Sequence, residues 1–110
     1  MIVFVNDDLA YRLKEPHNFR QFNIEIMAPK ERLNQLRKTL ADLIEFDSDS
    51  IAWVSAAGLQ ALPPVRDDAA WGSGFTQMID KARPHGWIRD RPKLAIKAHV
   101  VWAKSTTVDE

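Results

Sequence analysis

The sequence predicts an α+β fold of the ferredoxin-like kind, a sandwich in which two helices cover one face of a mostly antiparallel sheet of four or five strands. Three observations support this prediction. Residues 19–57 follow a strand, helix, strand pattern, residues 67–82 form a second amphipathic helix, and residues 93–103 alternate like a long strand. Together they read as two β-α-β units in a single domain that spans residues 1–110.

The first eighteen residues are expected to form a short strand or arm and then an irregular segment. Residues 2–5 are β-branched and aromatic, and two aspartates stop the run. Pro16 pushes the residue before it toward extended geometry, and residues 9–18 show no sustained period. A turn or irregular segment is therefore predicted there.

The organising stretch begins with a strand and continues as a helix. Three apolar residues alternate with three polar ones over 21–26, which predicts a strand with one buried face. Pro29 suits the first turn of a helix, and leucines then recur at spacings of three and four as far as Ile44. We expect a helix of about four turns from Lys30, a turn at 46–50, and a strand at 51–55 that places Ile51 and Trp53 on one face.

The second half is less uniform. Residues 56–64 are compatible with a short strand at 59–62 or with irregular structure, and two prolines end the segment. Asp67 and Asp68 are placed to cap the second helix, whose apolar residues face the sheet. The long strand presents Lys97 and His99 on the side opposite its apolar residues. Residues 104–110 look like a frayed tail.

Composition excludes several classes of protein. The chain is 45% hydrophobic and 27% charged, as in ordinary soluble domains, so disordered and fibrous classes are excluded. Fifteen basic and fifteen acidic residues cancel, and we therefore expect neither nucleic-acid nor membrane binding. With no cysteine there is no disulfide, thiolate nucleophile or cysteine-ligated zinc. A cytoplasmic protein is expected, because no signal peptide or membrane-length apolar run is present.

His99 is the first candidate for chemistry. An imidazole on the uncovered face of the sheet, beside Lys97, can act as a general base or proton shuttle near neutral pH. Glu25 points to the same face if the apolar residues of its strand face the helices, so it is the candidate partner that orients His99. In the competing interpretation, His99 faces solvent or a partner protein. This interpretation is favoured, because a single histidine at one strand position is not a specific sign of catalysis.

Aromatic residues supply the candidate ligand-binding wall. His85, Gly86 and Trp87 follow the second helix, so Trp87 is a candidate wall for a planar ligand and His85 a hydrogen-bonding group beside it. The structural interpretation is favoured here: Gly86 caps the helix and Trp87 packs on the core. Trp53 is a wall candidate if its side of the strand faces the open side of the sheet.

Known site motifs are missing. The three histidines show no metal-ligand spacing, and the acidic run at 47–50 lacks the glycine and the glutamate of a calcium loop. Gly72, Ser73 and Gly74 form neither a phosphate loop nor a nucleophile elbow, so close packing of a helix end is the favoured explanation. We therefore expect no metal and no cofactor.

Two hypotheses about function follow, and no sequence motif decides between them. In the first, a homodimer binds or transforms a small, partly apolar molecule, with His99 as the proton-transfer group, in the manner of an isomerase, cyclase or lyase. In the second, the open sheet face or the first strand pairs with another protein, with no catalysis. A third and weaker hypothesis, nucleic-acid binding, requires one surface to gather five basic residues: Arg83, Arg89, Arg91, Lys93 and Lys97.

Overall fold

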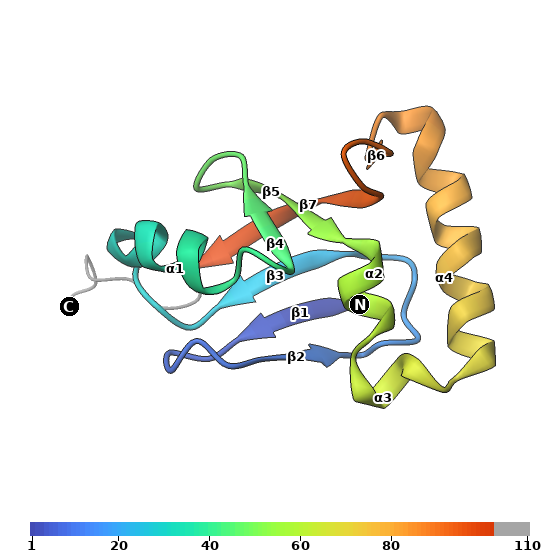
Figure 1. Ribbon diagram of the computed structural model, residues 1–110, viewed down its shortest axis with the longest axis horizontal. Coiled ribbons are helices and arrows are strands. Elements are labelled where there is room, and N and C mark those ends of the chain that lie inside the picture. Colours follow the sequence, from blue (N-terminus) through green and yellow to red (C-terminus); the bar gives the residue numbers. More distant parts are fainter. Residues whose placement is uncertain (103–110) are drawn as a thin grey trace.

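The computed structural model describes residues 1–102, which form a seven-stranded mixed sheet curled into a half-barrel, with four α-helices around it (Figure 1). The strands are β1 (Ile2–Val5), β2 (Tyr11–Lys14), β3 (Asn23–Ile26), β4 (Ile44–Phe46), β5 (Ile51–Ser55), β6 (Ile88–Arg89) and β7 (Ala95–Trp102). The helices are α1 (Leu33–Thr39), α2 (Ala56–Gln60), α3 (Pro63–Arg66) and α4 (Ala69–Ala82), with short 3₁₀ turns η1 (Lys30–Arg32) and η2 (Arg83–His85).

The predicted ferredoxin-like sandwich is wrong, because the sheet has more strands and a different order. Its strand order is β2-β1-β3-β7-β5-β4, with β6 also paired to β7. β1, β3 and β7 run parallel to one another, whereas the remaining pairs are antiparallel. The last strand lies in the centre rather than at an edge, because its eight residues are long enough to pair with β3, β5 and β6.

Strand β2 occupies part of the segment that the sequence analysis left irregular. It pairs antiparallel with β1, and the backbone N–H of Asn6 donates to the carbonyl of Ala10 at 2.8 Å to close the turn between them. Leu9 adopts a positive φ of 69° within that turn. Pro16 follows the strand, and Glu15 before it adopts a positive φ of 48° instead of the extended geometry that was expected.

The first long helix is shorter than predicted. α1 ends at Thr39, and Ile44 begins strand β4. Most of the apolar stripe is nevertheless buried, because Leu36 contacts the core from the helix, while Leu40, Leu43 and Ile44 reach it from the C-cap, the following turn and the strand. Apolar residues at helical spacing are therefore divided here between a helix and a strand.

The uncertain segment after β5 is helical. The Ser55 hydroxyl accepts a hydrogen bond from the backbone N–H of Gly58 at 3.1 Å and so caps α2. Neither the possible strand at 59–62 nor an irregular segment is found there. The prolines begin α3, where their missing N–H groups are tolerated.

Strand alternation divides the sheet into an inner and an outer face. The inner-face residues, which include Ile24, Ile26, Ala98 and Val100, are buried in a single hydrophobic core. The residues between them point to the outer face. On β3 and β7 these include Asn23, Glu25, Lys97, His99 and Val101. These five side chains are partly or fully exposed.

Helix α4 crosses the end of the sheet at which β3 and β7 begin (Figure 1). Its start is fixed by Asp68, whose carboxylate accepts the Trp71 backbone N–H at 3.0 Å. Trp71 is only 1% exposed, stacks on Phe75 with ring centroids 4.6 Å apart, and donates its indole N–H to the Pro16 carbonyl at 2.9 Å. These contacts tie α4 to the segment that precedes β3.

Two sequence expectations concern the chain ends and membranes. The predicted tail at 104–110 lies outside the described residues. Across residues 1–102, none of the helices combines the length and apolar character that a membrane crossing requires.

Candidate functional site

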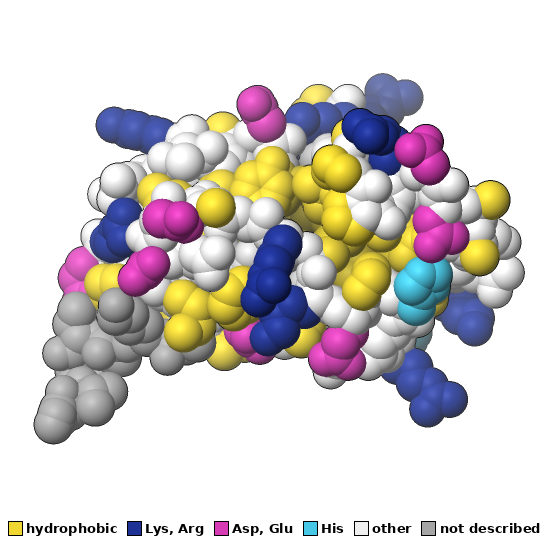
Figure 2. All heavy atoms as spheres, turned by 90° about the horizontal axis from the view of Figure 1, so that it is seen from below, with side chains coloured by type: hydrophobic (Ala, Val, Ile, Leu, Met, Phe, Trp, Pro, Cys, Tyr) yellow, Lys and Arg dark blue, Asp and Glu magenta, His cyan; other side chains and the backbone are white. Residues whose placement is uncertain are grey.

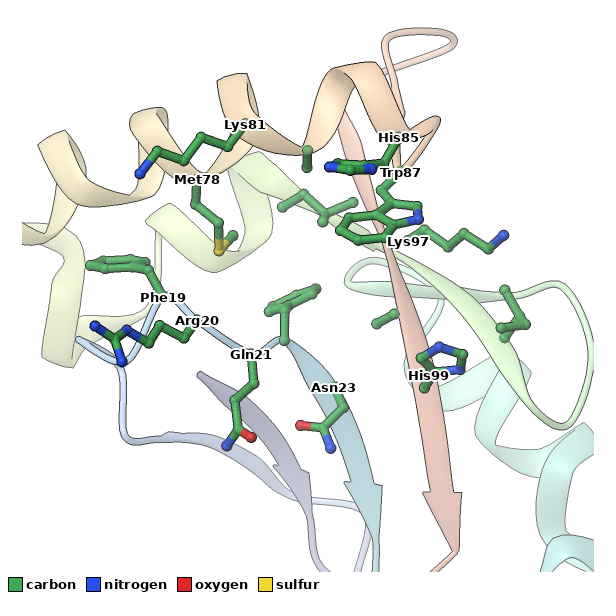
Figure 3. Close-up of a pocket in the computed structure, with 15 residues that line it drawn as sticks. Phe19, Arg20, Gln21, Asn23, Met78, Lys81, His85, Trp87, Lys97 and His99 are labelled. Carbon is green, nitrogen blue, oxygen red and sulfur yellow. The ribbon is translucent and has the colours of Figure 1, made fainter.

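A pocket of about 530 Å³ lies between α4 with η2, the segment before β3, and the sheet (Figure 3). α4 buries one face along its whole length, from Trp71 to Ala82, and its Met78 and Lys81 side chains contribute one wall of the pocket. Residues 19–23 form a second wall, and strand β7 forms the floor. The volume falls within the range of about 300–1,000 Å³ that is usual for small-molecule sites.

Four of the six predicted site residues line this pocket. His99 and Lys97 come from β7, whereas His85 and Trp87 come from the end of η2 and the loop that follows it. The strand and the helix end are thus brought together, as the first functional hypothesis requires. Glu25 and Trp53 are absent from the pocket lining.

His99 is open to the pocket rather than sealed in the core. Its register neighbours are Asn23 on β3 and Ile51 on β5. Within residues 1–102, no hydrogen bond or ion pair involves the His99 side chain, so both ring nitrogens are available to a ligand.

His85 and Trp87 form one stacked unit at the pocket rim. Their ring centroids lie 4.5 Å apart with an interplanar angle of 21°. Gly86 between them has φ of 76°, a conformation that glycine adopts without strain. The Trp87 carbonyl accepts the Lys97 backbone N–H at 2.8 Å, and the indole remains 48% exposed. Trp87 is therefore anchored to β7 as a wall instead of being packed into the core.

The pocket interior is apolar in the middle. Phe22, Met78 and Ile96 contribute from the three walls, and Phe19 closes the end nearest the start of α4 (Figure 3). Together with Trp87 they give a ligand apolar surfaces on several sides.

The charged groups of the pocket are all basic. Arg20, Lys81 and Lys97 line it together with two histidines, and none of the described lining residues is acidic. Arg20 and Lys81 lie on either side of Phe19 at one end, whereas Lys97 extends from the other end (Figure 3). The pocket thus combines an apolar interior with a positively charged rim.

Asn23 adds a buried polar group. Its side-chain oxygen is inaccessible to solvent and has no hydrogen-bond partner within the described chain. An unsatisfied buried acceptor costs about 1–3 kcal/mol and is uncommon in folded proteins. Asn23 lines the pocket beside His99, but an oxygen with no accessible surface is not open to a ligand there.

Comparison of the chain with protein-family models, curated proteins and solved structures found no match. The functional argument therefore depends on the geometry of the pocket. No group of three or more metal-ligating side chains occurs among residues 1–102.

Glu25 is not brought to His99. In the register of β3 and β7, Glu25 faces Val101 instead, and its carboxylate lies 3.6 Å from the ammonium of Lys14. Lys14 and Arg12 both lie over the ring of Phe4, at 4.7 and 5.1 Å from its centroid. Figure 2 views the molecule from the side of β2 and shows basic side chains lying across hydrophobic ones on this surface. Glu25 thus belongs to a charged cluster outside the pocket.

Trp53 belongs to a different cluster on the outer face. The Arg89 guanidinium lies 5.0 Å from the Trp53 ring centroid and forms two hydrogen bonds, each of 3.0 Å, with the Glu45 carboxylate. The hydrogen bonds from Arg89 lower the pKa of Glu45 below its usual range. Trp53 is accordingly explained by packing under Arg89.

The basic residues of the nucleic-acid hypothesis are partly neutralised. Arg89 is paired with Glu45, and Arg83 lies 2.8 Å from the Asp90 carboxylate. This pairing weakens the positive field on which that hypothesis depends.

Several pocket residues escaped the sequence analysis. Arg20 precedes the alternating residues, where no local pattern indicates which way it points, and Gln21 was assigned only to the polar side of a strand. Met78 and Lys81 are three residues apart on α4, and this spacing puts them on one face of the helix. Only the crossing of α4 over the end of the sheet turns this face into a pocket wall.

Proposed function

We propose that this protein binds a small, partly apolar organic molecule in the pocket between α4 and β7, and that His99 exchanges a proton with it. The single observation that carries the proposal is the convergence of an unpaired imidazole and an aromatic wall on one recess of ligand size. The proposal requires neither a metal nor a cofactor.

The chemistry assigned to His99 is that of a general acid or base. A ring nitrogen without a protein partner can take a proton from an acidic group of the ligand and return it at another position. Lys97 lies on the same strand, two residues before His99. Asn23 is the neighbour of His99 on β3. Glu25 has no part in this step, since it pairs with Lys14.

The rival function, a non-catalytic interaction module, would use the open sheet face or the first strand, but β1 is already paired on both sides, with β2 and β3. The recess lined by His99 and Trp87 favours the small molecule instead. Outside the pocket, the outer face carries Val101 at 44% exposure, which is the feature that a protein partner would use. The homodimer and the cytoplasmic location remain predictions from the sequence.

The proposal predicts that small aromatic compounds bind in this pocket. Titrating a library of single-ring and two-ring compounds into nitrogen-labelled protein should shift the backbone amide signals of residues 19–23, the end of α4, and β7 around His99. Trp87→Ala should weaken the hits about tenfold, since it removes a large apolar wall.

Tyr11→Ala provides the matched control, because Tyr11 is also an exposed aromatic residue but lies on β2, away from the pocket. Binding by this variant should equal that of the unaltered protein. Signal shifts that concentrate on β2, or an equal loss of binding in both variants, would contradict the proposed site.

A further inference from the structure

We infer that the pocket selects an organic anion, a molecule with an apolar body of ring size that carries a carboxylate or phosphate group. This inference rests on the proposed function and names the class of ligand. It follows from the distribution of charge, from the placement of the basic groups, and from the shape of the apolar interior.

The charge of the pocket departs from that of the whole chain. Acidic and basic residues are equally numerous in the sequence, with fifteen of each. The pocket nevertheless gathers Arg20, Lys81 and Lys97, together with His85 and His99, and no described acidic residue lines it. A neutral protein thus carries a local positive field at this pocket, and such a field attracts anions.

The three cations of the pocket also lack the ion pairs that hold several other basic residues. Ion pairs hold five basic side chains elsewhere: Lys14, Lys30, Arg66, Arg83 and Arg89. Within residues 1–102, the side chains of Arg20, Lys81 and Lys97 make no ion pair and no hydrogen bond. Their charges are therefore free to pair with a ligand.

The placement of these groups suits a molecule with a charged end and an apolar body. Figure 3 shows the basic side chains at the two ends of the pocket, with Met78 and Trp87 between them. The apolar body would lie against Trp87 and Met78, and its anionic group would reach either basic end.

The test compares two ring compounds of the same size that differ in charge. Naphthoate carries a carboxylate, whereas naphthylmethanol is neutral. Calorimetric titration at low salt should show naphthoate binding about tenfold more tightly, the factor expected for one good charge-assisted contact. This preference should shrink as sodium chloride is raised to physiological strength, because salt screens exposed charges.

A triple variant with Arg20→Gln, Lys81→Gln and Lys97→Gln should lose the preference while binding naphthylmethanol as before. The control variant combines Arg37→Gln, Lys38→Gln and Lys93→Gln, which change the net charge equally but lie outside the pocket lining. This control should keep the preference, since the effect belongs to the pocket rather than to the net charge.

The outcomes distinguish a failure of the anion inference from a failure of the proposed function. Equal affinity for the two compounds, or a preference that survives in the pocket variant, overturns the anion inference and leaves the binding site intact. Binding of neither compound overturns the inference and the proposed function together. Naphthyl phosphate as a third probe distinguishes the two anions: tighter binding than naphthoate assigns a phosphate ligand, and weaker binding assigns a carboxylate.

Discussion

Two glycines of α4 illustrate how a single hydrogen atom in place of a side chain shapes this site. A Cβ atom on Gly74 would lie 2.4 Å from Cε2 of Phe19, a pocket-lining residue. A Cβ on Gly72 would meet nothing within 4 Å. Close packing, the favoured explanation of this motif from sequence, therefore holds for Gly74 and not for Gly72.

Alanine at the two positions should have opposite effects on stability. Gly74→Ala should lower the free energy of unfolding by about 1–3 kcal/mol, because the methyl group displaces the Phe19 ring. Gly72→Ala should raise it by about 1 kcal/mol, since alanine favours the helix and meets no obstacle. Urea unfolding monitored by circular dichroism measures both. Equal effects of the two substitutions would show that Phe19 does not contact Gly74.

At the scale of the element, the start of α4 depends on a carboxylate. Asp68 accepts the Trp71 backbone N–H at 3.0 Å and lies 3.1 Å from Nε2 of His17. The hydrogen bond from Trp71, followed by the charge of His17, lowers the pKa of Asp68. The folded protein consequently holds this group ionised at a lower pH than the unfolded chain does.

The lowered pKa predicts how stability depends on pH. The contribution of Asp68 should be complete above the pKa of the unfolded chain, near pH 4, and should be lost as pH falls through the lower folded value. Asp68→Asn, which still caps a helix, should therefore flatten the fall of the melting temperature below about pH 4. Asp67→Asn is the control, because Asp67 pairs with Arg66 instead. If the melting temperature of Asp68→Asn falls at acid pH as steeply as that of the unaltered protein, the stability change does not come from Asp68.

Other elements show where the spacing of hydrophobic residues predicts the secondary structure and where it does not. The alternation of β3 and β7 identified both strands and correctly assigned Lys97 and His99 to the side away from the core. The same reasoning failed for residues 40–44, because the spacing of leucines in a helix resembles their spacing across a helix, a turn and a strand. It also missed α2, which depends on the Ser55 cap and on helix formation through Gly58.

At the scale of the molecule, the candidate site was predictable in part. His99, Lys97, His85 and Trp87 were named from sequence, and the structure places all four around one pocket. The partner assigned to His99 was not found, because strand order and register decide which residues meet across a sheet. A central β7 sets Asn23 beside His99, and no local pattern in the sequence contains that information.

The predicted homodimer is likewise a property of the whole molecule. The chain has a mass of 12.6 kDa, so light scattering at micromolar concentration should give about 25 kDa for a dimer, twice the mass of one chain. If the dimer forms through the outer face, Val101→Glu should reduce the mass to that of the monomer, because it places a charge in the interface. A monomer mass for the unaltered protein rules the dimer out.

Strand β7 is hydrogen-bonded to β3, β5 and β6, and it also carries Lys97 and His99. A compound held by these two side chains would thus be attached to the strand that joins both halves of the sheet. Occupancy of the recess and cooperative melting of the protein would then be linked, so that heat resistance rises with the amount of compound added. A simple thermal-shift screen is for this reason a direct route to the natural ligand.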